Sequence, residues 1–281
     1  MAEALGYCAA EVRRWDYDRY LAGLFAPAAA RERLFALYAF NHEIAKVRET
    51  VREPMLGQIR LQWWREAIAG IYEGKIRKHP VVEALASAIG GADAAAMPAR
   101  AGFEALIDAR ELDLAGPAPA SLAELEAYCA GTSSQLLWLA AEMLGARGEG
   151  TREALRPVGI AWALTGLVRA IPFHARARRQ YIPADIAAAT GLTEEALFSL
   201  KPSAELHCAA AELAACAERH LASISGRAER AARPLMLMAT LARAYLHRLR
   251  RSGHEVTERP VEISPAAKII RLWWAAWTGV T

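Results

Sequence analysis

The chain has 281 residues, of which 54% are hydrophobic, and a formal net charge of +3. This much apolar material predicts a folded chain with a large buried core and excludes an intrinsically disordered one. The small net charge gives no reason to expect nucleic-acid binding, because nucleic-acid-binding proteins carry broad basic surfaces.

The N-terminal stretch MAEALGYCAAEVRRWD lacks the apolar run of a signal peptide and carries acids that a transit peptide avoids. No apolar run reaches the ~20 residues that a membrane span needs. We therefore expect a cytoplasmic protein, with peripheral attachment at the inner membrane left open. The cysteines lack CxxC spacing, which predicts reduced structural thiols and neither a disulfide framework nor a zinc site. They are Cys8, Cys129, Cys208 and Cys216.

Apolar residues recur at spacings of three and four along the chain, and alternating β-branched runs are nearly absent, which indicates α-helices. Prolines and glycine-rich stretches divide this pattern into roughly ten or more helices. The expected breaks include Pro27, Pro54, Pro80, the stretch up to Pro98, Pro157 and Pro265. No connecting stretch is long or low in complexity. The sequence predicts an all-α fold with a single domain over residues 1–281.

The stretch from residue 31 to residue 74 is expected to be largely buried helix. At helical spacing, one of its faces carries Tyr38, His42, Ala45 and Glu49. Further along, Trp63 and Trp64 stand beside two arginines. These tryptophans either pack in the core or border a site where the arginines reach an anion.

Three acids follow at helical spacing within residues 103–114, namely Glu104, Asp108 and Glu111. Acids on one helical face repel each other unless a cation or an arginine relieves them. Arg110 provides that relief if the face is solvated, and a functional role of the acids is the alternative.

The stretch LVRAIPFHARARRQYIP, residues 167–183, sets four arginines around a single histidine and contains two prolines. Guanidinium groups bind phosphate and carboxylate groups bidentately, so an anionic ligand is one reading of this segment. In the other reading Arg169 pairs with Glu49 or with the acids of residues 103–114 and only holds the fold together.

The C-terminal stretch ISPAAKIIRLWWAAWTGVT predicts a helix that carries Trp273, Trp274 and Trp277 on one side. Such a helix either packs onto the bundle or lies in a membrane interface. A preceding segment that ends in Arg248, Arg250 and Arg251 adds weak attraction to anionic lipid.

Four of these stretches, in this order, resemble the motifs of the squalene and phytoene synthase family of head-to-head prenyl transferases. FALYAFNHEIAKVRE is similar to the family helix YAFCRxxDDxxD, and LIDARELDL is similar to LIDGxxxDL. LEAYCAGTSSQLLWL stands at the Tyr-Cys stretch with a degraded AGTVG signature, and LTGLVRAIPFHARARRQYIP is similar to LxNxxRDxxxDxxRGRxYLP. The resemblance covers nearly the whole chain. It implies the isoprenoid synthase fold, a bundle of helices around a central cavity.

The resemblance also implies two aspartate-rich motifs across that cavity, which hold Mg²⁺ and through it the diphosphates of two prenyl substrates. Here the first motif is degenerate, with His42, Ala45, Lys46 and Glu49 at its positions. The second is degenerate too, with Gly166, Ala170 and His174. Alanine cannot ligate a metal, and histidine suits zinc or copper better than magnesium. No two of the six aspartates in the chain are spaced four apart to replace the motifs.

What the resemblance leaves is the anion side of the site, for which we expect Tyr38, Arg169, Arg179 and Tyr181. We expect no catalytic residues and no metal, and therefore a non-catalytic binding or assembly protein with a prenyl or lipid ligand. The departures themselves resemble a catalytically degenerate branch of the family, which includes the phytoene-synthase-like assembly factor of mitochondrial respiratory complex I and its bacterial relatives. That kinship implies complex I subunits or assembly intermediates as partners.

Two other functions stay open at this point. An active prenyl transferase with atypical metal ligands would still require Mg²⁺. A metal-dependent enzyme of other chemistry would use His42 and His174 together with a carboxylate such as Glu49. Whether the cavity is open or filled by bulky side chains decides between a ligand carrier and a pure scaffold.

Overall fold

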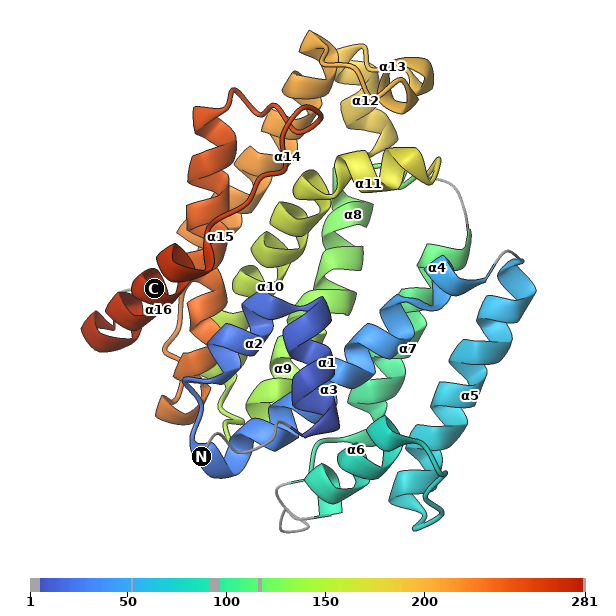
Figure 1. Cartoon of the computed structure of the whole chain (residues 1–281), viewed down its shortest axis with the longest axis vertical. Helices are drawn as coiled ribbons and strands as arrows, with labels where there is room; N and C mark the ends of the chain where they lie inside the picture. Colours follow the sequence, from blue (N-terminus) through green and yellow to red (C-terminus); the bar gives the residue numbers. More distant parts are fainter. Residues whose placement is uncertain (1–5, 52, 91–96, 116–117, 280–281) are drawn as a thin grey trace.

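The computed structural model describes residues 6–51, 53–90, 97–115 and 118–279, and within them the chain forms helices joined by short connections, without a strand. The all-α prediction is confirmed. The helices gather into one bundle (Figure 1). Its buried apolar residues make one connected core that extends from Cys8 to Ala275. Part of the break expected before Pro98, residues 91–96, lies outside the described residues.

The N-terminal helices form the side of the bundle that carries the first motif. They are α1 (Tyr7–Trp15), α2 (Tyr17–Gly23), α3 (Ala28–Ala45), α4 (Val47–Thr50), α5 (Pro54–Tyr72), α6 (Pro80–Gly90) and α7 (Arg100–Ala115). Helix α5 packs against α7, and α3 packs against α1 and α6. Figure 1 shows α5, α6 and α7 together at one edge of the molecule.

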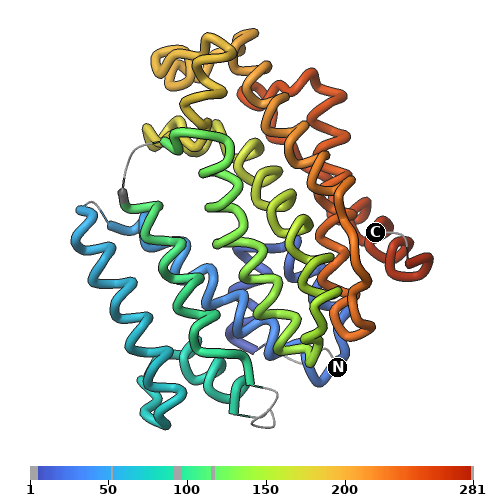
Figure 2. The backbone as a smooth tube through the Cα atoms, turned by 180° about the vertical axis from the view of Figure 1, so that it is seen from behind, coloured from blue at the N-terminus to red at the C-terminus, as the bar shows by residue number. Residues whose placement is uncertain are grey.

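The remaining helices form the other side of the bundle. They are α8 (Leu122–Cys129), a π-helix (Ala130–Ser134), α9 (Gln135–Met143), α10 (Glu149–Arg169), α11 (Ile171–Arg176), α12 (Ala184–Thr190), α13 (Glu194–Phe198), α14 (Ala204–Ala222), a 3₁₀ turn (Arg230–Ala232), α15 (Arg233–Arg251) and α16 (Pro265–Thr278). Helix α10 packs against α14 and α15, which run side by side when the bundle is seen from behind (Figure 2).

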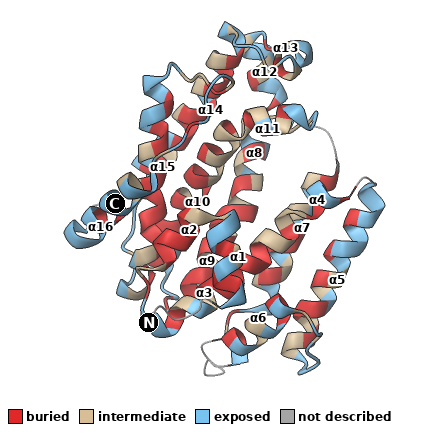
Figure 3. Ribbon diagram, viewed as in Figure 1, coloured by how far each residue is buried: buried red, intermediate tan, exposed pale blue. Residues whose placement is uncertain are grey.

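Helix α3 is one of the most deeply buried elements, as the sequence predicts (Figure 3). Its Phe40 meets Trp64 and Phe103 edge-on, with ring centroids 5.4 and 5.7 Å apart. Trp64 is buried, while Trp63 is half-buried under the guanidinium of Arg77. The core-packing reading therefore holds for Trp64, and Trp63 covers the rim of the core.

Prolines begin most of the helices that they were expected to begin. Pro54, Pro80 and Pro265 each open a helix, where the missing N–H costs no hydrogen bond. Pro157 is the exception, because α10 continues through it from Glu149 to Arg169. The predicted break at Pro157 is therefore wrong. Packing of α10 against the helices around it outweighs the ~3 kcal/mol that an internal proline costs.

The π-helix lies against α10 with no room between the two backbones. A Cβ on Gly159 would stand 2.4 Å from the Cα of Ser134. The Ser134 hydroxyl donates to the Arg156 carbonyl oxygen at 2.6 Å. Single-turn π-helices are frequent at functional sites, and this one places Thr132 and Ser133 at the site described below.

Asp18 on α2 is a buried hub that joins α2 to α10, α15 and α16. Tyr245 donates to it at 2.8 Å, and the Lys268 ammonium lies 2.6 Å from its other oxygen. Arg169 lies 4.0 Å away, stacks over the Tyr245 ring at 3.6 Å and donates to the Val261 carbonyl oxygen at 3.1 Å. The C-terminal segment is thus fixed to the bundle through charges.

Helix α16 packs against α15 and buries Leu272 and Ala275. Its opposite side is exposed, at 45–70%, and carries Ile269, Ile270, Trp273, Trp274 and Trp277. Docking and an outward apolar face are therefore both present. Among the described helices, none is long and apolar enough to cross a membrane.

Candidate functional site

A cavity of about 270 Å³ lies between α2, α3, α4, α7, α8, the π-helix, α10 and α11. Apolar residues of α10 form one wall, namely Trp162, Ala163, Gly166 and Leu167. Polar side chains form most of the rest. The cavity expected from the family resemblance is therefore open, although its volume falls just below the ~300–1,000 Å³ usual for ligand pockets.

Asp113 is the centre of the polar wall. It accepts hydrogen bonds from the hydroxyls of Tyr128 at 2.7 Å and Tyr181 at 2.9 Å, and Arg110 lies 3.4 Å from its second oxygen. Arg110 also donates to the Tyr128 oxygen at 3.0 Å. Burial raises the pKa of both tyrosines well above the usual value, so both hydroxyls stay protonated. The network holds α7, α8 and the loop after α11 in a fixed arrangement.

Four arginines line the cavity, and they come from four different elements: Arg19, Arg48, Arg110 and Arg179. Two carboxylates accompany them, Glu49 and Asp113. Arg179 donates to the Arg48 carbonyl oxygen at 2.9 Å, which draws the loop after α11 toward α4. The lining itself has four guanidinium groups against two carboxylates, and Asp16, outside the lining, pairs with Arg19 at 2.5 Å, so an excess of positive charge remains.

Several polar atoms around the cavity find no hydrogen-bond partner. Within the described part of the chain, four buried side-chain polar atoms of cavity-lining residues have no hydrogen-bond partner. These four are Arg19 Nε, Arg110 Nε, Ser133 Oγ and His174 Nδ1. An unpaired buried polar atom costs roughly 1–3 kcal/mol, so this concentration shows that the hydrogen bonding around the cavity is incomplete within the chain.

The first motif divides between this cavity and its surroundings. Ala45 and Glu49 line the cavity, whereas His42 and Lys46 do not. His42 stacks on Trp15 with ring centroids 5.5 Å apart, and Lys46 pairs with Glu43 at 2.5 Å. Helix α3 ends at Ala45, so the single face predicted for Tyr38, His42, Ala45 and Glu49 is interrupted there. Tyr38 is buried against Arg19 and also lies outside the cavity lining.

The second motif comes together as the sequence predicts, with Gly166, Ala170 and His174 all on the cavity. Helix α10 ends at Arg169, and α11 starts at Ile171 with Pro172 in its first turn, where a proline cannot continue the hydrogen bonding of α10. The His174 ring lies 4.6 Å from that of Tyr181. Burial, and then the charge of Arg179, lower the pKa of His174 to about 4, so the imidazole is neutral at pH 7.

The four residues expected for anion binding separate into two pairs. Arg179 and Tyr181 line the cavity, and Tyr38 and Arg169 do not. Arg169 pairs with neither Glu49 nor the acids of α7. It joins the Asp18 hub, because the C-terminal segment brings the Val261 carbonyl and Tyr245 to it. Sequence reasoning did not find that partner because Asp18 lies far away along the chain.

The acids of α7 are relieved by arginines other than Arg110. Arg65 pairs with Asp108 at 2.6 Å and Glu111 at 2.8 Å, and Arg100 pairs with Glu104 at 2.7 Å. All of these groups are at least partly exposed, which supports the reading of a solvated face. Arg110 instead points inward to Asp113, so its predicted role as the relief of that face is wrong.

His42 and His174 also fail to form the metal site that was left open. Each contacts a different ring, Trp15 and Tyr181 respectively. Within the described residues, the side chains that converge as metal ligands are elsewhere, on α8 and α14. The geometry therefore does not support a metal-dependent enzyme that uses these two histidines as ligands.

The cavity includes residues that sequence reasoning did not assign to it, namely Arg19, Arg48, Asp113, Tyr128, Thr132 and Ser133. One signal was available, because Asp113 belongs to the LIDARELDL stretch and Tyr128 to the Tyr-Cys stretch. Both stretches resemble family motifs, and the structure joins them by the hydrogen bond between Tyr128 and Asp113.

The fold and the cavity define an all-α protein of the isoprenoid synthase type. The structure is similar to a solved dehydrosqualene synthase, with a TM-score of 0.82 and 18% identity over 98% of this chain and 95% of that chain. It is also similar to a squalene synthase from Alicyclobacillus acidocaldarius, with a TM-score of 0.70 and 18% identity over 88% and 93% of the two chains. Residues 12–267 match the squalene/phytoene synthase family. The chain belongs to that family.

Relatives of two kinds resemble the chain. It is 33% identical over 189 residues to NADH dehydrogenase (ubiquinone) complex I, assembly factor 6, of Bos taurus, covering 67% of this chain but only 56% of the bovine protein. It is 27% identical over 274 residues to the Rattus norvegicus protein of the same name, covering 96% of this chain and 81% of that one. Presqualene diphosphate synthase of Rhodopseudomonas palustris is 26% identical over 257 residues, 89% of each chain.

Proposed function

We propose that the protein is a non-catalytic member of the squalene/phytoene synthase family that binds one anionic ligand with an apolar tail, a prenyl or lipid phosphate, in its central cavity. In this proposal it acts as an assembly factor, with subunits or assembly intermediates of respiratory complex I as partners. The observation that carries the ligand part is the cavity lining, with four arginines and four unpaired polar atoms beside an apolar wall.

The charge of the lining supports direct binding of an anion. A prenyl transferase of this fold is expected to neutralise diphosphate through Mg²⁺ held by carboxylates. Here guanidinium groups occupy the cavity instead, and they form bidentate hydrogen bonds with phosphate oxygens without a metal. Trp162, Ala163 and Leu167 offer an apolar surface for the tail.

The donor set does not fit Mg²⁺. Ala45 and Ala170 line the cavity at motif positions and carry no ligand atom. Of the two carboxylates, Asp113 already accepts from Tyr128 and Tyr181 and lies beside Arg110. Glu49 alone cannot supply the several hard oxygens that Mg²⁺ takes from protein and phosphate together. The proposed binding therefore involves no magnesium.

The assembly role rests on kinship, because the relatives named complex I assembly factor 6 resemble the chain over much of its length. Deleting the gene in its host is expected to lower complex I activity and to leave carotenoid and hopanoid content unchanged. Unchanged complex I activity would contradict the assembly role. A loss of hopanoid or carotenoid would favour a prenyl transferase.

Peripheral contact with a membrane is supported by the outward face of α16. Five large apolar side chains are exposed there, three of them tryptophans, which favour the membrane interface. Flotation with vesicles that contain anionic lipid tests this contact. We expect the unaltered chain to float and the triple variant Trp273→Ser, Trp274→Ser, Trp277→Ser to stay in solution. Equal flotation of the two proteins would refute it.

Binding and catalysis are separated by one experiment on the purified chain. We expect calorimetry to show that farnesyl diphosphate binds in the presence of EDTA. Incubation with farnesyl or geranylgeranyl diphosphate and Mg²⁺ is expected to yield no squalene-type or phytoene-type product. Formation of such a product would establish the alternative, an active prenyl transferase with atypical metal ligands. The similarity to presqualene diphosphate synthase is the reason to test this alternative.

A matched pair of variants locates the ligand. Arg179→Gln is expected to weaken farnesyl diphosphate binding at least ~10-fold, because a hydrogen bond to a charged group contributes roughly 1.5–3 kcal/mol. Arg259→Gln, at an exposed arginine in the segment before α16, is expected to bind as the unaltered chain does. Equal binding by both variants, or no binding by the unaltered chain, would show that the cavity is not the ligand site.

A further inference from the structure

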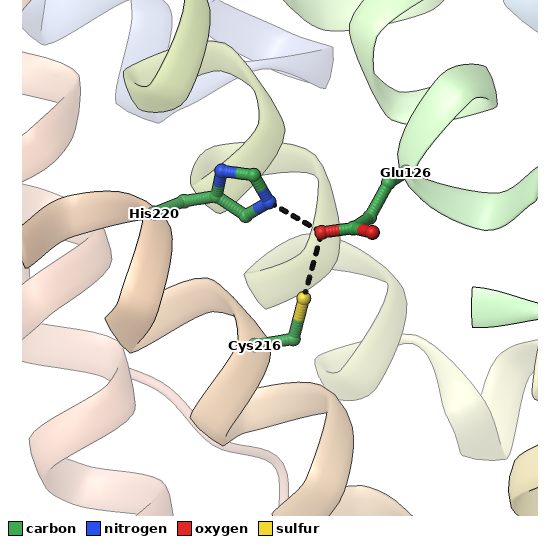
Figure 4. A group of neighbouring side chains, drawn as sticks. All are labelled: Glu126, Cys216 and His220. Carbon is green, nitrogen blue, oxygen red and sulfur yellow. Dashed lines mark hydrogen bonds and ion pairs between the residues drawn. The ribbon is translucent and has the colours of Figure 1, made fainter. Parts of the chain in front are cut away.

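A second cluster of functional side chains lies away from the central cavity, between α8 and α14. Its members are Glu126 on α8 and Cys216 and His220 on α14 (Figure 4). One ligand atom from each residue lies within 4.8 Å of the other two. Nothing in the proposed function uses these side chains, and the groove beside them shares no lining residue with the central cavity.

The geometry of the cluster comes from helix periodicity. Cys216 and His220 are four residues apart on α14, so their side chains lie on the same face one turn apart. Both point toward the same carboxylate oxygen (Figure 4). The Cys216 thiol donates to Glu126 Oε1 at 3.2 Å, and His220 Nε2 lies 2.6 Å from that oxygen.

The three donors are a thiol sulfur, an imidazole nitrogen and a carboxylate oxygen, a set that Zn²⁺ takes in proteins. A zinc ion holds sulfur at ~2.3 Å and nitrogen or oxygen at ~2.0–2.2 Å, which sets neighbouring ligand atoms ~3.3–3.7 Å apart in a tetrahedron. The sulfur and oxygen already have nearly this separation. The nitrogen and oxygen reach it by opening less than ~1 Å, which rotation of two partly exposed side chains provides.

The cluster is buried on one side and open to solvent on the other, as a metal site with a free coordination position requires. The Cys216 side is closed, with only 1% of the residue exposed, while the His220 and Glu126 side chains are 22% and 33% exposed. On that open side lies a groove of about 490 Å³ with both residues in its lining. Its other polar residues are Glu153, Arg156, Ser223 and Ser225. The groove gives an ion an entry path and leaves room for a fourth ligand.

We propose that Glu126, Cys216 and His220 form a zinc site whose fourth position, occupied by water or a small anion, opens into this groove. Zinc replaces the two protons that converge on Glu126 Oε1: the thiol releases its proton to solvent, and the neutral imidazole ligates through Nε2 with its proton moved to Nδ1. The thiolate selects zinc over magnesium and calcium, which prefer oxygen ligands. The site shares no residue with the central cavity, so the zinc proposal does not depend on the proposed function.

Metal titration of the full chain tests the site. The chain is stripped with EDTA, dialysed with its thiols kept reduced, and titrated with Zn²⁺ in calorimetry and with Co²⁺ in absorption spectroscopy. We expect one equivalent of either ion, a thiolate-to-cobalt charge-transfer band, and no competition from excess Mg²⁺. Absence of stoichiometric binding, or a cobalt spectrum without the thiolate band, would overturn the proposal.

Variants assign the ligands. Cys216→Ser and His220→Gln are expected to bind Zn²⁺ at least ~10-fold more weakly, since loss of even an outer-shell partner costs ~10–100-fold in metal affinity. The matched controls are Cys208→Ser and His247→Gln, an exposed cysteine on α14 and an exposed histidine on α15. They are expected to bind as the unaltered chain does. Loss of binding in the controls with retention in the cluster variants would place the ion elsewhere and refute the site.

Because Cys216 is buried, Cys216→Ser can lose zinc binding simply by unfolding. A second variant that folds is therefore needed to test the site. His220 is only partly buried, so His220→Gln is expected to fold, as circular dichroism will show. Zn²⁺ is expected to raise the melting temperature of the unaltered chain and of the two controls, since an ion that binds only the folded state stabilises it. An equal rise in His220→Gln would show that the ion binds outside the cluster.

Discussion

Arg169 and Arg179 come from the same sequence motif, only ten positions apart, and serve two different regions of the molecule. Arg169 belongs to the Asp18 hub, where it meets a carboxylate, a tyrosine ring and a carbonyl oxygen. Arg179 lines the central cavity, where it donates a hydrogen bond to the backbone carbonyl of Arg48. In the hub, each cation contacts a carboxylate. In the cavity, several cations lie close together beside polar atoms that have no hydrogen-bond partner.

The difference separates charges that hold the fold together from charges that we propose bind a ligand. Charges that neutralise each other hold helices together, as Asp18 holds α2 to α15 and α16. Donors that lack partners, such as Arg19 Nε and Arg110 Nε, stabilise nothing within the chain and are maintained at a cost. The first arrangement predicts large effects on stability, and the second predicts effects on binding.

The largest effect is expected from Asp18→Asn. The substitution keeps the shape of the side chain but removes the negative charge that Lys268 and Arg169 face. Removing one partner of a buried pair costs ~3–5 kcal/mol, because the other charge stays buried without compensation. Urea unfolding followed by circular dichroism measures the loss.

The control for this substitution is Glu73→Gln, which breaks the exposed pair with Lys75. An exposed ion pair contributes ~0–1 kcal/mol, so the control is expected to unfold nearly as the unaltered chain does. If Asp18→Asn cost no more than the control, the hub would not hold the C-terminal helix in place and the comparison of the two regions would fail.

The next effect concerns the pH dependence of stability through His174. Burial and Arg179 lower its folded-state pKa to about 4, below the unfolded value of 6.5. Between those values the unfolded chain binds more protons, so this contribution is fully present above pH 6.5 and is lost as the pH falls toward 4. One pKa unit corresponds to about 1.4 kcal/mol, which sets an upper limit of ~3.5 kcal/mol.

The variant His174→Gln isolates this contribution, because glutamine fills similar space and does not titrate. Its free energy of unfolding is expected to fall less between pH 7 and pH 4.5 than that of the unaltered chain. His247→Gln, at an exposed histidine, is the control and is expected to keep the full dependence. Parallel curves for all three proteins would mean that the cavity tolerates a charged imidazole.

A smaller effect in energy, but the sharpest contrast, is expected from the pair Arg169→Gln and Arg179→Gln. Arg169→Gln is expected to lower stability by ~1–3 kcal/mol, since it removes a ring contact and a hydrogen bond, and to leave farnesyl diphosphate binding unchanged. Arg179→Gln is expected to weaken farnesyl diphosphate binding and to leave stability nearly unchanged. Calorimetry measures farnesyl diphosphate binding and urea unfolding measures stability for both variants. If each variant changed both properties, the distinction between the two regions would be wrong.

The sequence predicted the fold class and much of the second motif, and it predicted poorly where distant segments meet. Helical spacing and the prolines located the starts of α3, α5 and α16, because these are properties of neighbouring residues. The partner of Arg169 and the inward turn of Arg110 depend on contacts across the bundle, which spacing does not report. The three-residue cluster on α8 and α14 escaped for the same reason, since its cysteine and glutamate are distant in the chain.

The smallest effect is expected at a third kind of arginine, Arg65 on the solvated outer face of α7 and α5. Its ion pairs with Asp108 and Glu111 are short, at 2.6 and 2.8 Å, yet both acids are about half exposed. Water and salt screen such pairs, so Arg65→Gln is expected to cost less than ~1 kcal/mol, and less still at high ionic strength. Urea unfolding at two salt concentrations measures this. A cost equal to that of Arg169→Gln would show that pairing alone, without burial, explains the strength of the hub, and burial would no longer distinguish the two regions.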